Sequence, residues 1–147
     1  MAQVIYQGFF DDVAAGNVTS SADLRAMLLM ANTTTDTEED AQTMSDFTTI
    51  DEADGVGYAA LDIAGVSVAY DSTNNRLVID GTDDDFESGG IDTCSRNVTR
   101  VLIKRYVDGT DANDVPWSSI DIGPYSPGGG TFDVTWNTTG ILYIGWS

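Results

Sequence analysis

The stretch VSVAYDSTNNRLVID, residues 66–80, decides the fold that we expect for this chain. Both halves of the stretch alternate β-branched or aromatic residues with other residues, a pattern typical of half-buried strands. The polar centre ends in Asn74 and Asn75, and asparagine tolerates the positive φ that tight turns need. The stretch therefore predicts a β-hairpin with one face toward a core. The residues expected on that face are Val66, Val68, Tyr70, Leu77 and Ile79.

The rest of the chain predicts one helix and further short strands. Apolar residues are spaced by four over 4–15, and Gly16 suits the position that ends a helix. Residues 20–31 fit either a helix or a buried strand. The pattern predicts a mainly β, single domain spanning 1–147, an antiparallel β-sandwich or jelly-roll-like barrel with a short N-terminal helix. The other strands are expected at 58–63, 98–107, 115–122, 132–136 and 141–146. We expect a polar loop at 32–46, with one helical turn near 38–44, and a proline- and glycine-rich loop at 123–130.

The charge balance narrows the range of partners. The chain has 24 acidic and 6 basic residues and a formal net charge of −18. Such a surface repels nucleic-acid phosphates and anionic lipid headgroups, so we expect neither partner. The opening residues, MAQVIYQGFF, have no positive segment followed by a long apolar run, and they do not resemble a signal peptide.

The residues that most often carry chemistry are scarce. The chain has no histidine and a single cysteine, Cys94, so the commonest general base and the usual zinc ligand are missing. The acidic run Asp83-Asp84-Asp85 with Glu87 invites a calcium interpretation, but an EF-hand loop starting at Asp80 would need Gly and Glu where Asp85 and Ile91 stand. A looser divalent-cation site and a solvated acidic loop remain alternatives. We therefore expect that the chain is not an enzyme and that it has neither a cofactor nor a defined metal site.

Four of the six basic residues lie close together, and they allow two interpretations. On an extended strand Arg100 and Lys104 share a face. The group can pair with the chain's own acidic loops across strands. It can also form a cationic spot that contacts a partner. The four residues are Arg96, Arg100, Lys104 and Arg105.

Three aromatic residues complete the candidate partner contacts. Trp117, Tyr125 and Trp146 are the aromatics that we expect to reach the surface. Tyrosine and tryptophan are enriched in protein interfaces, although they also serve as core residues. The sequence alone leaves both roles open for these three.

Several segments together resemble a known family. They are the amphipathic opening, LRAMLLM at 24–30 with the Thr/Asp-rich stretch after it, FTTIDEADGVGY at 47–58, VAYDSTNNRLVIDG at 68–81 and TFDVTWNTTGILYIGW at 131–146. With them the chain resembles small virion structural proteins of tailed bacteriophages, of the capsid cement (decoration) type. In such proteins the segment that matches 24–30 is an extended apolar strand, so the resemblance favours a strand there.

The resemblance implies a function outside catalysis. A cement protein made in the bacterial cytoplasm would bind the outer capsid shell of the virion and stabilise contacts between major capsid protein subunits. Capsid lattices offer threefold positions, so we expect a homo-trimer. A tail, head-tail connector or head-fibre protein is the main alternative. An acidic carbohydrate-binding or lytic module is a third class.

Overall fold

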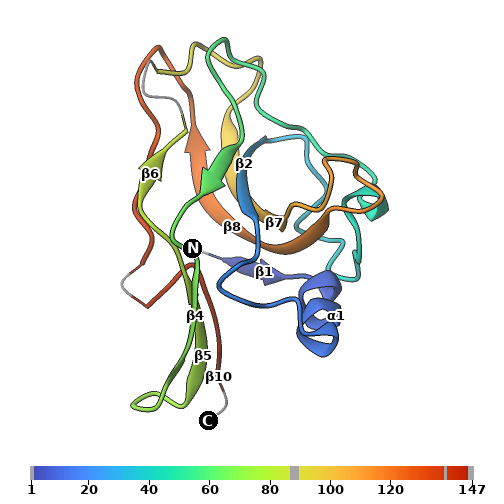
Figure 1. Cartoon of the computed structure of the whole chain (residues 1–147). Coiled ribbons are helices and arrows are strands. Elements are labelled where there is room, and N and C mark those ends of the chain that lie inside the picture. Colours follow the sequence, from blue (N-terminus) through green and yellow to red (C-terminus); the bar gives the residue numbers. More distant parts are fainter. Residues whose placement is uncertain (1, 87–89, 138, 146–147) are drawn as a thin grey trace.

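The computed structural model describes residues 2–86, 90–137 and 139–145 (Figure 1). Strands dominate, and one helix lies near the N-terminus, as predicted. In chain order the elements are β1 (Gln3–Ile5), α1 (Gln7–Ala15), β2 (Leu24–Met30), the 3-10 turn η1 (Met44–Asp46), β3 (Leu61–Ile63), β4 (Ser67–Asp71), β5 (Arg76–Asp80), β6 (Asp84–Asp85), β7 (Val98–Arg105), β8 (Val115–Tyr125), β9 (Asp133–Val134) and β10 (Leu142–Gly145).

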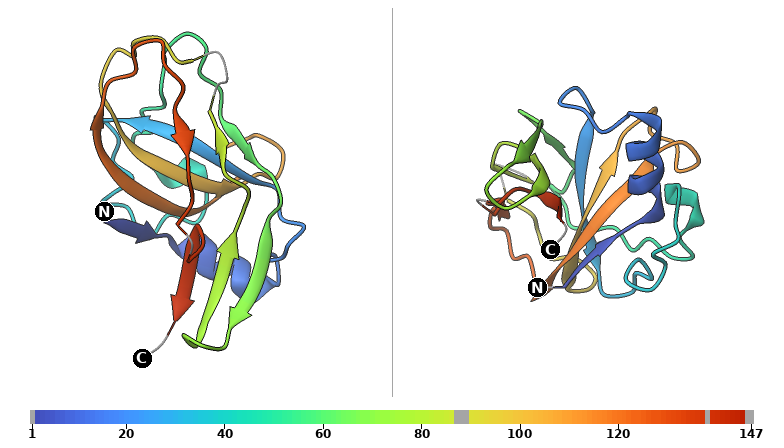
Figure 2. Two further views of the ribbon diagram at one scale, coloured as in Figure 1. Left: turned by 90° about the vertical axis from the view of Figure 1, so that its left-hand side faces the viewer. Right: turned by 90° about the horizontal axis from the view of Figure 1, so that it is seen from below.

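The strands form antiparallel sheets that pack together as a β-sandwich. The larger sheet has five strands in the order β1-β8-β7-β2-β3, and a three-stranded sheet has the order β10-β5-β4. The short pair β6-β9 extends the second layer. Figure 2 shows the curved larger sheet behind the second layer. Helix α1 lies beside the beginning of β8, where Phe9 packs against Trp117. The predicted fold class, a β-sandwich with a short N-terminal helix, is confirmed.

Strand β2 is apolar on both faces, which explains why its sequence fits a helix as well as a strand. Leu24, Ala26 and Leu28 belong to the main core between the sheets. Met27 and Leu29 point the other way, into a second core that the 3-10 turn and the segment 41–50 cover. A strand buried on both faces shows a continuous apolar run without alternation. The strand that the resemblance favoured at 24–30 is confirmed.

The helix begins later in the chain than the sequence predicts. Residues 3–5 pair with β8 as a strand, and α1 begins only at Gln7. Between them Tyr6 is fully buried, and its hydroxyl donates to the Thr35 carbonyl oxygen at 2.8 Å. Gly16 ends the helix in the left-handed conformation, with φ of 75°, as its sequence position predicts.

The hairpin forms with the predicted register. Val68 pairs with Ile79, and Ile79 is fully buried in the main core. Asn75 has a φ of 52°, as the turn requires. The prediction for Tyr70 is wrong, because 60% of this residue is exposed. The outer half of the hairpin extends beyond the five-stranded sheet, so Tyr70 has no opposing layer to pack against (Figure 1).

Several element boundaries differ from the prediction, and β7 ends at Arg105, two residues before the end of the predicted strand 98–107. Strand β8 continues through Gly123 and Pro124, which we predicted as loop, because it stays paired with β7 as far as Tyr125. Tyr58 lies in a turn before β3, where its N–H donates to the Gly55 carbonyl oxygen at 3.1 Å. The predicted strand 132–136 shortens to the two residues of β9, and the helical turn expected near 38–44 lies later, at η1.

Candidate partner-binding surfaces

All six basic side chains form ion pairs within the chain, so the predicted basic cluster does not form a free cationic spot. Lys104 is almost fully buried, whereas the Arg96 side chain is 48% exposed and is the most accessible of the four predicted contacts. Pairing with the chain's own carboxylates is therefore the interpretation that the structure supports. The nearest N–O distances are 3.0 Å for Arg25–Asp62, 2.9 Å for Arg76–Asp71, 2.6 Å for Arg96–Asp51, 3.6 Å for Arg100–Asp36, 2.7 Å for Lys104–Asp114 and 2.7 Å for Arg105–Asp12.

Asp12 joins α1 to the large sheet. Its carboxylate accepts two hydrogen bonds from the Arg105 guanidinium, at 2.7 and 2.8 Å, and one from Trp117 Nε1 at 2.8 Å. Asn17 Nδ2 donates a fourth, at 2.9 Å. Burial raises the pKa of Asp12, but these hydrogen bonds outweigh burial and lower the pKa below its ordinary value. Asp12 was not among the predicted contact residues, although its spacing of three from Phe9 places it on the buried side of the helix.

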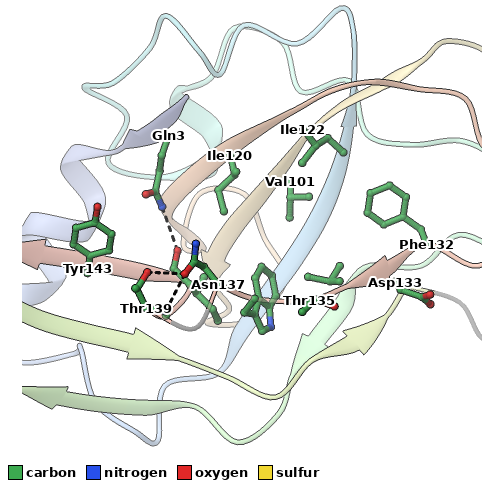
Figure 3. Close-up of a pocket in the computed structure, with 14 residues that line it drawn as sticks. Gln3, Val101, Ile120, Ile122, Phe132, Asp133, Thr135, Asn137, Thr139 and Tyr143 are labelled. Carbon is green, nitrogen blue, oxygen red and sulfur yellow. Dashed lines mark hydrogen bonds between the residues drawn. The ribbon is translucent and has the colours of Figure 1, made fainter. Parts of the chain in front are cut away.

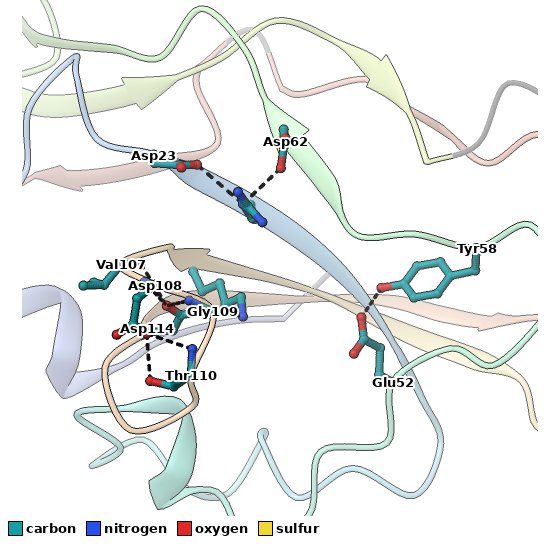
Figure 4. A network of polar contacts seen from close by, with 11 residues as sticks. Asp23, Glu52, Tyr58, Asp62, Val107, Asp108, Gly109, Thr110 and Asp114 are labelled. Carbon is teal, nitrogen blue, oxygen red and sulfur yellow. Dashed lines mark hydrogen bonds and ion pairs between the residues drawn. The ribbon is translucent and has the colours of Figure 1, made fainter.

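Asp114 organises the loop between β7 and β8 (Figure 4). It is fully buried, and Lys104 Nζ lies 2.7 Å from its carboxylate. The backbone N–H groups of Val107 and Gly109 donate to the same carboxylate at 2.8 and 3.2 Å. Burial raises the pKa of Asp114, but the hydrogen bonds and the lysine charge lower it by more than burial raises it. The pKa of Asp114 therefore lies below its ordinary value.

The lowered pKa of Asp114 predicts a loss of stability in acid. A carboxylate with a folded-state pKa below its unfolded value contributes stability above the unfolded value, and the contribution disappears as pH falls through the folded value. We expect the free energy of unfolding to fall between roughly pH 5 and pH 2. Urea unfolding across a pH series should show a smaller acid-induced fall for Asp114→Asn than for wild type.

A matched variant separates this effect from general relief of negative charge. Asp111 lies in the same loop and is exposed. Asp111→Asn removes the same charge without disturbing the buried contacts of Asp114. If Asp111→Asn and Asp114→Asn change the acid-induced loss of stability equally, the buried carboxylate is not its source.

The three predicted aromatic contacts have different outcomes. Trp117 is fully buried, and its ring packs edge-on against Phe9 at a centroid distance of 5.3 Å, so the prediction that it reaches the surface is wrong. Tyr125 is 37% exposed and packs edge-on against Phe132 at 5.1 Å. Trp146 lies outside the described residues.

An apolar cleft of about 380 Å³ opens between the large sheet and the segment 132–143 (Figure 3). Val101, Ile120 and Ile122 form its floor on β7 and β8, and Phe132 stands at one end. The cleft exists because the short strand β9 and the residues after it cross this part of the sheet without pairing to it. Clefts of this size with apolar linings are typical of binding sites.

Polar groups in the lining hold the walls of the cleft in place. Gln3 Nε2 donates to Ser118 Oγ at 2.9 Å and to the Ile141 carbonyl oxygen at 3.3 Å, which ties β1 to the C-terminal segment. Asn137 Oδ1 accepts from the backbone N–H and the hydroxyl of Thr139, at 3.0 and 2.9 Å. Asp133 is the one carboxylate among the described residues that line the cleft.

The acidic stretch after β5 is partly structural. Asp83 accepts the Trp136 backbone N–H at 2.7 Å and so fixes the chain near the cleft. Glu87, the last residue of the run that suggested a cation site, lies outside the described residues. Across 2–86, 90–137 and 139–145, no three carboxylates or cysteines gather in a way that could hold a metal ion.

No protein-family model matches the chain, and comparison with curated proteins and with solved structures yields no match. None of the described helices is long and apolar enough to cross a membrane.

Proposed function

We propose that this chain is a capsid cement protein of a tailed bacteriophage. It would bind the major capsid protein on the outer surface of the virion and stabilise contacts between neighbouring capsid subunits. The segments that resemble this family support the proposal. The β-sandwich is compatible with it, because a small, densely paired domain can transmit load between the subunits that it bridges.

The observation that carries the proposal is the contrast between the cleft and the rest of the surface. The chain has a net charge of −18, and its six basic groups are each paired with a carboxylate. The cleft floor, Val101, Ile120 and Ile122, is uncharged and apolar. An apolar centre within a charged surround is the usual anatomy of a protein interface. A partner would insert an apolar side chain into the cleft and present basic groups around it.

A cement protein does not need a strong single contact. A capsid repeats one binding position many times, so copies that are linked to one another gain avidity without any additional contact per copy. The homo-trimer at a threefold position stays a prediction of the resemblance, and it concerns copies bound to the capsid surface, not the free protein.

The copy number in purified virions tests the proposal against its main alternative. A cement protein is expected at hundreds of copies per particle. Quantitation of protein bands that gave six or twelve copies would instead assign the chain to a tail, connector or head-fibre position.

Filling the cleft should weaken capsid binding while leaving the fold intact. Thr135 is exposed and lines the cleft, so the indole of Thr135→Trp would occupy the space without removing a buried group. We expect Thr135→Trp to bind capsids that lack this protein at least about tenfold more weakly than wild type, because it excludes the partner from the centre of the interface. Co-sedimentation with such capsids measures the binding.

Thr93→Trp is the matched control, because Thr93 is also exposed but does not line the cleft. It should bind like wild type. Thermal unfolding of both variants should stay close to wild type. Wild-type binding by a folded Thr135→Trp variant would show that the cleft is not the capsid contact.

A further inference from the structure

The three-stranded sheet projects from the body of the sandwich and has two open edges. Figure 2 shows β10 and β4 at its two sides, with the hairpin tip and the C-terminal end of β10 pointing away from the large sheet. Within the described residues, β10 and β4 each pair with β5 alone. An open edge presents unpaired backbone N–H and C=O groups that can add a further strand.

The edge of β10 lacks the features that usually prevent such pairing. Natural edge strands are protected by charged residues, proline or bulges. Leu142–Gly145 contains no charged residue and no proline, and it pairs with β5 without a register shift. The other edge is less open, because β4 ends in Asp71. Tyr143 on β10 is 48% exposed, beside the end of the apolar cleft that it also lines.

Charge makes this sheet the most suitable place for two copies to meet. Residues 66–80 and 141–145 contain two carboxylates, Asp71 and Asp80, and one guanidinium, Arg76, which gives a local charge of −1 in a chain of −18. Asp71 and Arg76 neutralise each other at 2.9 Å. A contact elsewhere on the acidic surface would bring like charges together, whereas a contact along β10 would not.

The direction of the strands selects the symmetry of the contact. Both β4 and β10 are antiparallel to β5, so they run in the same direction. A ring built around an axis along the strands would place β10 of one copy parallel to β4 of the next, and parallel pairs are slightly less stable. A twofold axis would instead pair β10 with β10 in antiparallel fashion. Twofold contacts are also the commonest in soluble oligomers.

We propose that two copies of this chain associate through their β10 edges across a twofold axis. The three-stranded sheets of the two copies then join into one antiparallel sheet with the strand order β4-β5-β10-β10-β5-β4. The contact is a property of the free protein and does not depend on capsid binding. Because each copy has the same net negative charge, salt should strengthen the association.

Analytical ultracentrifugation of the wild-type chain and two edge variants tests the contact. We expect the mass measured for wild type to be twice the 15.7 kDa mass of one chain. Tyr143→Asp places a like charge beside the twofold axis in both copies, so it should raise the dimer dissociation constant at least about tenfold. Tyr70→Asp makes the same change on the β4 edge, where Tyr70 is 60% exposed, and should leave the mass unchanged.

A crosslinking experiment keeps the test valid if Tyr143→Asp does not fold. A short bis-maleimide should join two copies of Tyr143→Cys but not two copies of Tyr70→Cys. The native thiol of Cys94 is buried and should contribute little background. A wild-type chain that sediments as a monomer or a trimer would overturn the proposal, as would crosslinking through residue 70 and not through residue 143.

Discussion

Asp12→Ala is expected to lower the free energy of unfolding by about 3–5 kcal/mol, the usual cost of removing one partner from a buried ion pair. The variant leaves the Arg105 guanidinium without its bidentate acceptor, and it leaves the Trp117 Nε1–H without an acceptor inside the core. It also removes the polar contacts that connect α1 to β7 and β8. The free energy of unfolding of a small domain is only about 5–15 kcal/mol, so the variant would lose a large part of its stability.

The neighbouring Asp11 provides a matched control. It lies on the same helix and is exposed, so Asp11→Ala should change stability by no more than about 0.5 kcal/mol. The loss of stability in Asp12→Asn should lie between the losses in Asp11→Ala and Asp12→Ala, because the amide oxygen can still accept one hydrogen bond while the charge is lost. Denaturant unfolding, followed by tryptophan fluorescence, measures all three variants. Equal midpoints for Asp11→Ala and Asp12→Ala would show that the Asp12 contacts contribute little.

The hairpin could be predicted because its signals are local. Alternation sets the two faces and the asparagines set the turn, so the burial of Ile79 and the positive φ of Asn75 follow from a few neighbouring residues. The exposure of Tyr70 does not follow, although it shares a face with Ile79. Its environment depends on where the opposite sheet ends, and that limit is set by strands far away in the sequence.

The polar contacts of the candidate site were beyond prediction for the same reason. Arg105 pairs with a carboxylate 93 residues earlier, and Arg96 with one 45 residues earlier. The sequence shows the clustered cations and many carboxylates but not which of them meet. Trp117 is similar, because the acceptor that allows its indole N–H to be buried lies 105 residues away. The cleft is likewise a product of the crossing of 132–143 over β7 and β8, which no local pattern encodes.

Ile79→Ala should cost about 2–5 kcal/mol of stability, through the lost transfer free energy of the side chain and the cavity that remains. Ile79 is fully buried on the central strand of the three-stranded sheet. Val68 on β4 and Leu142 on β10 flank it in register, so the substitution removes a contact that all three strands share. We expect a lower denaturant midpoint with an unchanged slope, and weaker dimer and capsid binding at temperatures where the variant begins to unfold.

Val78→Ala tests the register of the hairpin beside it. A slip of one residue would exchange the two faces of β5, so that Val78 would lie in the core and Ile79 outside. In the structure Val78 is half-buried and faces away from Ile79, so truncating it should cost clearly less than truncating Ile79. Urea unfolding of both variants beside wild type decides between the registers. A loss of less than about 0.5 kcal/mol for Ile79→Ala, the value of an ordinary surface site, together with a larger loss for Val78→Ala, would mean that the faces are reversed.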